Sequence, residues 1–296
     1  MKAACRLAFV LPALLLSGCL FTTRKLPVPR GPSITQTVAP EELVRRINQR
    51  WAELETLNAR VDLQATELKS KEGVAKDYTT IHGVILMRKP EQLRVLGQVP
   101  VLGTRMFDMV SDGKNFTMYI PSRDKAIEGS ADSTKKSENQ LENLRPGFFF
   151  DAMAVRGIAS DDLYSVSADV DTQDDAAKKH RYSVPEYILT ILRRKGDTQE
   201  LMPLRVVRFH RDDLEPYQQD IYDAEGNLVT QVFYSAYGTY GPSKYPSKVT
   251  ILRPIEGIQI VLTVDNVVEN SNLITDDQFT IKALKMPEDT QIQKLP

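Results

Sequence analysis

The side chains that could support catalysis or bind a metal are scattered along this 296-residue chain. Its three histidines, His82, His180 and His210, lie far apart and lack the spacing of metal ligands. The acidic run from Asp169 to Asp175 lacks the glycine and the terminal glutamate of an EF-hand loop, which favours a solvated loop. No Gly-x-Ser-x-Gly elbow or phosphate-binding glycine loop is present. We therefore expect no enzyme activity, no cofactor and no metal.

Cys19 is the residue for which the sequence does predict chemistry. Lys2 and Arg6 precede a short apolar run that ends in Leu16-Ser17-Gly18-Cys19. Such a run is too short to span about 30 Å of hydrocarbon as a helix, which indicates a processed signal over residues 1–18. The ending resembles a lipobox, and this implies cleavage before Cys19 and lipidation of its thiol and new amino terminus. Two or three acyl chains hold a protein at a bilayer. The alternative is an ordinary secretory signal with a coincidental cysteine.

Charge and cysteine content narrow the class of protein further. Removing residues 1–18 leaves 36 basic against 39 acidic residues, so no basic face large enough for nucleic acid is expected. Cys5 leaves with the signal and Cys19 is consumed by lipid, so the mature chain should have no disulfide. The exported fold must therefore be stabilised by an apolar core. No later segment has the apolar length of a membrane helix.

The period of the apolar residues predicts one helix followed by a large sheet. Residues 19–39 read as the lipidated cysteine and a proline-rich tether, and residues 40–296 as one domain. Pro40 suits the first turn of a helix expected over 40–56, with Trp51 near its apolar edge. Strands are predicted at 58–69, 78–89, 91–99, 104–111, 114–121, 123–129, 161–168, 180–193, 201–211, 216–223, 228–237, 246–253, 257–265 and 274–282. Short turns between them indicate a meandering antiparallel sheet, and a sheet of this size must curl.

Methionine and phenylalanine are concentrated on the early strands and in a helical insertion between 131 and 157. Methionine is soft and unbranched, and it suits a surface that accommodates a variable apolar partner. A curved sheet with an apolar face and an aromatic insertion describes a lined cavity. The same residues could instead form the core between sheet and helix, and both interpretations stay open. The candidate groove residues are Met87, Met106, Met109, Phe116, Met118, Phe148, Phe149 and Met153.

Several segments resemble the LolB-type lipoprotein receptors and the related LolA-type carriers. The early segment is Gln98-Val99-Pro100-Val101-Leu102-Gly103-Thr104, followed by Met106 to Val110 and Asp112-Gly113-Lys114. The closing segments are Tyr245-Pro246-Ser247-Lys248-Val249, Ile258 to Val264, and Asp277-Gln278-Phe279-Thr280-Ile281. With the signal, the early helix and the insertion, the resemblance covers most of the mature chain.

This resemblance implies a mainly β (α+β) fold: an unclosed antiparallel half-barrel of about 11–12 strands with covering helices. Its concave apolar face would hold acyl chains of lipids or lipoproteins, for lipoprotein localisation or lipid handling. Val101 and Leu102 match the apolar loop that helps such receptors place lipoproteins in the membrane. The chain is longer than those receptors, with additional strands after residue 160.

The expected location is the periplasmic face of the outer membrane, because Leu20 replaces the aspartate that retains lipoproteins at the inner membrane in enterobacteria. The expected partners are the membrane, through the lipid anchor, and acyl chains. The alternative function is a non-catalytic envelope scaffold with a filled core and a protein partner. The tyrosines and glycines between 234 and 245 favour this alternative, because tyrosine is common at protein interfaces.

Overall fold

The computed structural model describes residues 35–69, 74–131, 145–174 and 181–295. The predicted signal at 1–18, Cys19, most of the tether and residues 132–144 of the predicted helical insertion lie outside these residues. The chain divides into two compact units, a larger one of residues 34–170 and 185–296 and a smaller one of residues 1–33 and 171–184. In the smaller unit, the Tyr182 hydroxyl donates a hydrogen bond to Gln173 Oε1 at 3.3 Å. No described helix is long and apolar enough to cross a membrane.

Most described residues belong to β-strands. The strands are β1 (Thr56–Lys69), β2 (Val74–Asp77), β3 (Ile81–Arg88), β4 (Gln92–Gln98), β5 (Arg105–Ser111), β6 (Asn115–Ile120), β7 (Lys125–Ser130), β8 (Leu163–Asp174), β9 (Arg181–Arg194), β10 (Leu201–His210), β11 (Pro216–Tyr222), β12 (Leu228–Tyr240), β13 (Ser243–Arg253), β14 (Ile258–Glu269) and β15 (Gln291–Lys294). The helices are α2 (Pro40–Glu53) and α3 (Pro146–Met153), with 3-10 turns η2 (Pro121–Arg123), η4 (Asp276–Phe279) and η5 (Ile281–Leu284).

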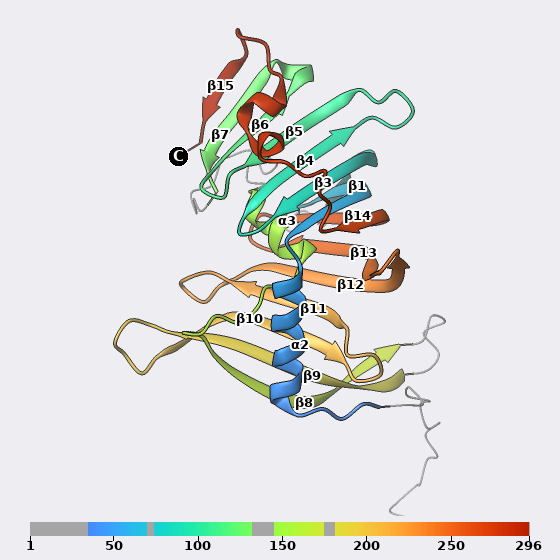
Figure 1. The fold of residues 1–296 in the computed structure, drawn as a ribbon, viewed down its shortest axis with the longest axis vertical. Helices are drawn as coiled ribbons and strands as arrows, with labels where there is room; N and C mark the ends of the chain where they lie inside the picture. Colours follow the sequence, from blue (N-terminus) through green and yellow to red (C-terminus); the bar gives the residue numbers. More distant parts are fainter. Residues whose placement is uncertain (1–34, 70–73, 132–144, 175–180, 296) are drawn as a thin grey trace, which may run out of the picture. The chain divides into compact units, whose positions relative to one another are not determined.

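The described strands form one 15-stranded sheet in the order β15-β7-β6-β5-β4-β3-β1-β14-β13-β12-β11-β10-β9-β8, with β2 paired to β1 (Figure 1). Most strands pair with their neighbours in the sequence, as the short turns predict. Three pairings depart from this meander: β1 pairs antiparallel with β3 and with β14, and β15 pairs parallel with β7. Because β15 and β8 end the sheet at opposite edges, the sheet is unclosed. The prediction of a mainly β, unclosed half-barrel with covering helices is confirmed.

The C-terminal segment differs from the prediction. The strand predicted over 274–282 is wrong, because η4 and η5 occupy this stretch. A reciprocal capping box between Thr275 and Gln278 starts η4, and Lys285 in the left-handed region (φ 48°) ends η5. The segment after η5 contains β15, which makes the sheet mixed rather than wholly antiparallel. The strands also number more than the expected 11–12.

The apolar core contains two larger clusters, one under each helix, and a small cluster of Val110, Tyr119, Ala126 and Leu284. The largest lies under α3 and joins β1, β3–β6 and β12–β14, where alternate residues such as Ile85 and Met87 of β3 are completely buried. A second lies under α2, where Leu43, Val44 and Ile47 pack against β9 and β10. Each apolar side chain buried this way contributes about 1.5–3 kcal/mol. Two helices thus cover different parts of one sheet (Figure 1).

Candidate functional site

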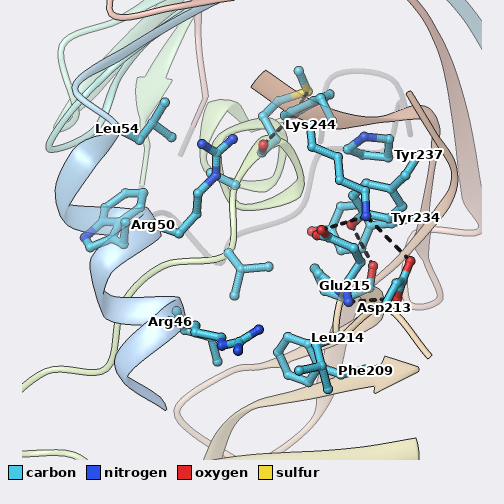
Figure 2. Close-up of a pocket in the computed structure, with 18 of the residues that line it drawn as sticks. Arg46, Arg50, Leu54, Phe209, Asp213, Leu214, Glu215, Tyr234, Tyr237 and Lys244 are labelled. Carbon is cyan, nitrogen blue, oxygen red and sulfur yellow. Dashed lines mark hydrogen bonds and ion pairs between the residues drawn. The ribbon is translucent and has the colours of Figure 1, made fainter. Parts of the chain in front are cut away.

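A cavity of about 440 Å³ lies in the larger unit, between α2 and residues of β10, β12 and β13 (Figure 2). It is bordered by both core clusters. Leu43 and Ile47 come from the cluster under α2, and Met153 and Tyr245 come from the cluster under α3. The hollow is therefore the place where the two clusters meet and neither fills the space. Its size is within the range of roughly 300–1,000 Å³ that is usual for small-molecule sites.

Helix α2 forms one wall of the cavity. Pro40 occupies its first turn, Glu41 and Glu42 lie at its positive end, and Arg50 lies at its negative end. Its C-terminal part is bound to neighbouring strands and turns. Arg50 Nη1 donates to Glu269 Oε2 of β14 at 3.0 Å. Lys89 Nζ donates to the Trp51 carbonyl oxygen at 2.8 Å. The wall is thus a regular helix held near its end by charged side chains.

Three tyrosines from β12 and β13 form the opposite wall. Tyr245 donates its hydroxyl hydrogen bond to the Met153 carbonyl oxygen at 2.5 Å, at the end of α3. Tyr237 donates to the Pro216 carbonyl oxygen at 2.7 Å. Burial raises the pKa of the phenols of Tyr234, Tyr237 and Tyr245, because the charged phenolate would lose its hydration. The wall is consequently neutral at ordinary pH and its buried hydroxyls are used by the protein itself.

Charged side chains are grouped around this apolar and aromatic space. Lys244 Nζ lies 3.0 Å from Glu215 Oε1 and 3.8 Å from Asp213 Oδ2. The same ammonium lies 5.6 Å from the centroid of the Tyr237 ring. Arg46 of α2 donates from Nε to Glu42 Oε1 at 2.8 Å. The cavity therefore combines an apolar and aromatic interior with paired ions around it.

The described residues contain no group of three or more histidine, cysteine, aspartate or glutamate side chains placed to hold a metal ion.

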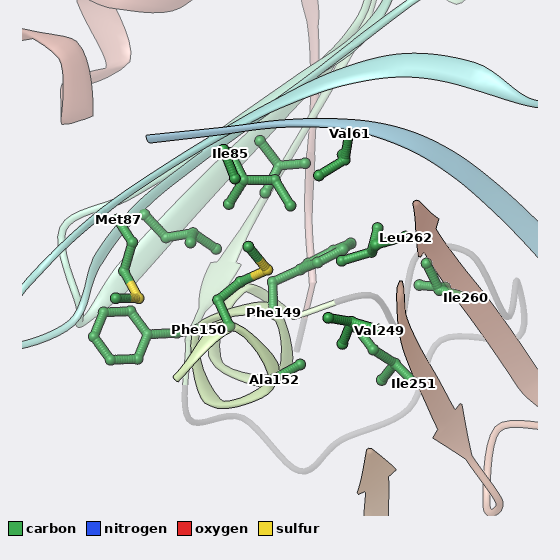
Figure 3. Packing of buried hydrophobic residues seen from close by; sticks show 14 of the residues in the cluster. Val61, Ile85, Met87, Phe149, Phe150, Ala152, Val249, Ile251, Ile260 and Leu262 are labelled. Atoms are coloured by element: carbon green, nitrogen blue, oxygen red, sulfur yellow. The ribbon is translucent and has the colours of Figure 1, made fainter. Parts of the chain in front are cut away.

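The structure brings seven of the eight predicted groove residues together, but as packed core. The seven are Met87, Met109, Phe116, Met118, Phe148, Phe149 and Met153, each at most 6% exposed. Figure 3 shows Phe149 and Phe150 of α3 directed toward Met87 and Ile85 on one side and Leu262 on the other. Of the seven, only Met153 also lines the cavity. The aromatic insertion therefore packs against the inner face as core, which is the second of the two interpretations that the sequence left open.

Met106 is separate from the other predicted groove residues. It is 43% exposed, whereas Phe107 and Met109 on the same strand pack with the core under α3. Because side chains of a strand alternate between faces, Met106 lies on the other face of the sheet.

The predicted membrane-insertion residues lie in the turn between β4 and β5. Val101 is fully exposed and Leu102 is 76% exposed, so neither folds back into the core. Val101 also has a φ of 68°, a left-handed conformation that a β-branched residue rarely adopts. The turn thus presents two apolar side chains that contribute nothing to packing, at a cost in backbone strain.

The sequence did not identify α2 and the tyrosine wall as a site. The tyrosines were noted as a possible protein interface, although Tyr234 and Tyr245 are buried. The apolar stripe of α2 was recognised, but its partner strands β9 and β10 follow more than a hundred residues later. The available signal was a helix with Trp51 at its edge together with tyrosines on two adjacent strands.

No protein-family model and no curated protein matches the chain. Among solved structures, it is similar to a LolA superfamily protein from Nitrosomonas europaea, with 12% identity, a TM-score of 0.49, and coverage of 84% of this chain and 100% of that one. It is similar to a DUF1329 family protein from Desulfovibrio piger, with 15% identity, a TM-score of 0.48, and coverage of 82% and 96%. It is also similar to an outer membrane lipoprotein-sorting protein domain from Vibrio parahaemolyticus, with 10% identity, a TM-score of 0.49, and coverage of 83% and 96%.

Two of these similar structures are named for the LolA superfamily or for lipoprotein sorting. At such low identities and TM-scores the likeness concerns the course of the chain. It says nothing about a ligand or an activity of this protein.

Proposed function

We propose that this protein binds acyl chains of lipids or lipoproteins in the cavity beneath α2, while lipids on Cys19 hold it at the periplasmic face of the outer membrane. The observation that carries the proposal is the hollow of about 440 Å³ between the two core clusters. Moving a methylene group of an acyl chain from water into an apolar cavity is favourable by roughly 0.8 kcal/mol of transfer free energy. A cavity walled by Leu43, Trp51, Met153 and Tyr245 offers that burial. The role is binding rather than catalysis.

A cavity-filling substitution tests this proposal. Ala154 lines the hollow and has an extended backbone (φ −151°, ψ 138°) that accepts a large side chain. In the full chain carrying Cys19→Ser, so that no lipid is attached there, Ala154→Phe should weaken binding of a fluorescent acyl probe about tenfold or more. Ala159→Phe, at an exposed position outside the cavity, is the matched control. Absence of probe binding by the parent chain, together with no lipid mass in native mass spectrometry, overturns the proposal.

The turn of Val101 and Leu102 supports a role in contact with the membrane. Burying one leucine in a bilayer contributes about 1.5–3 kcal/mol, so Leu102→Ser should lower vesicle binding of the Cys19→Ser chain roughly tenfold or more. Leu273→Ser is the control, because Leu273 is 77% exposed and Leu102 is 76% exposed. Equal loss of sedimentation with vesicles in both variants contradicts a specific role of the turn.

One observation favours the second candidate function, a non-catalytic envelope scaffold. The inner face under α3 is filled by Phe148, Phe149 and Phe150, as a scaffold with a closed core requires. If this candidate holds, the parent chain binds no acyl probe, and Ala154→Phe raises the free energy of unfolding without any other effect. The acyl-probe measurement therefore separates the two candidates.

A further inference from the structure

The size of the cavity restricts how much of a lipid it can hold. A methylene group is close in size to a water molecule, whose share of liquid volume is about 30 Å³. A cavity of about 440 Å³ is therefore of the order of size of one long acyl chain. The neighbouring inner face under α3 adds no space for further chains, because Phe149 and its neighbours fill it.

The charges around the cavity indicate the head group. Each of the three carboxylates in the lining has a cation partner: Glu269 pairs with Arg50, and Glu215 and Asp213 pair with Lys244. These contacts occupy Lys244 and Arg50, so neither of these two cations is available to a ligand.

Arg46 is the exception among the lining cations. Only its Nε has a hydrogen-bond partner among the described residues, the Glu42 carboxylate. Its two terminal amino groups are open, and Figure 2 shows its side chain reaching from α2 toward Leu214 across the cavity. A planar guanidinium with two open amino groups matches the two oxygens of a carboxylate or phosphate.

We propose that the cavity takes a single-chain amphiphile with an oxyanion head. The two terminal amino groups of Arg46 bind the oxyanion, and the chain lies along the space toward Met153 and Tyr245. This inference rests on the proposed function, because it assumes that the cavity beneath α2 is the acyl-binding site. It adds the number of chains, the charge of the head and the residue that binds it.

The test compares ligands that differ only in head or chain number. The Cys19→Ser chain is titrated with palmitate, methyl palmitate, a lysophosphatidic acid and a diacyl phosphatidic acid, with bound mass read by native mass spectrometry. Palmitate or the lysophosphatidic acid should bind about fivefold or more tightly than methyl palmitate, since a charge-assisted hydrogen bond to a half-exposed arginine is worth roughly 1 kcal/mol. The diacyl lipid should bind more weakly than the lysophosphatidic acid. The stronger of the two anionic ligands identifies a carboxylate or a phosphate head.

Two neighbouring arginines provide variant and control. Arg46→Gln should abolish the preference for the anionic head while binding of methyl palmitate is unchanged. Arg45→Gln removes another Glu42 partner, and Arg45 is outside the cavity lining, so the preference should remain. Equal binding of palmitate and methyl palmitate, or an Arg46→Gln chain that keeps the preference, overturns the inference and leaves acyl binding intact. If none of the ligands binds, the proposed function itself fails.

Discussion

Truncation of Phe149 tests whether the inner face under α3 is a packed core. The Phe149 side chain is 2% exposed and its ring centroid lies 4.2 Å from that of Phe148. Replacement of a buried phenylalanine by alanine removes its transfer free energy and leaves a cavity, which together cost about 3–5 kcal/mol. With a urea m-value of about 3 kcal/mol/M, Phe149→Ala should lower the unfolding midpoint by about 1 M or more.

The fluorescence of the single tryptophan allows the loss of packing under α3 to be measured directly. Trp51 packs edge-on against Phe150, with ring centroids 6.2 Å apart, so its fluorescence reports on the contact between α2 and α3. Ile281→Ala is the control, because Ile281 is 52% exposed and its loss should change the free energy of unfolding by less than about 0.5 kcal/mol. A Phe149→Ala protein within about 1 kcal/mol of the parent, with unchanged fluorescence, would refute the reasoning. The insertion would then be a removable cover over an open groove.

Two further predictions concern buried polar groups. The Asp108 side chain is 1% exposed and accepts hydrogen bonds from Arg94 at 2.8 Å and from Arg105 at 3.3 Å. Asp108→Asn should therefore lower the free energy of unfolding, measured by urea denaturation, by about 2–4 kcal/mol. Asp265 belongs to an exposed ion pair, so the control Asp265→Asn should lower it by less than about 1 kcal/mol. Equal losses would contradict a buried ion cluster. The pKa of the phenols of Tyr234, Tyr237 and Tyr245 is raised above the ordinary value of 10. Their contribution to the stability of the folded protein is therefore complete below pH 10 and is lost as the pH rises above it. An absorbance titration in which every tyrosine of the folded protein ionises near pH 10 would show that these phenols are not buried.

The sequence predicted most of the meander because turns and alternation are local properties. Gly113, Gly226 and Gly257 have positive φ values in turns that the sequence placed correctly. The pairings of β1 with β14 and of β7 with β15 are long-range, and no local pattern indicates them. The strand prediction for 274–282 was wrong because Phe279 and Ile281 alternate with polar residues as they would in a strand. In the structure, a capping box at Thr275 starts a 3-10 turn instead.

The candidate site was predicted less completely, for a related reason. Apolar composition identified residues that come together under α3, but it could not separate a filled face from an open one. That difference depends on whether Phe148 and Phe149 reach the sheet, and the structure shows that they do. The hollow beneath α2 results from the distance between two clusters, and this distance is a property of the assembled fold. No single segment of sequence contains it.

The two interpretations of the apolar residues apply to different parts of the sheet. Under α3, the strands that resemble the LolB-type receptors, including β4 and β5, are covered by phenylalanine and contribute core. Under α2, β10, β12 and β13 leave the hollow, and these strands follow residue 160. If the hollow beneath α2 binds acyl chains, the later strands are part of the binding site rather than an addition to it. Ala154→Phe should then affect acyl binding, while Phe149→Ala should affect mainly the stability of the fold.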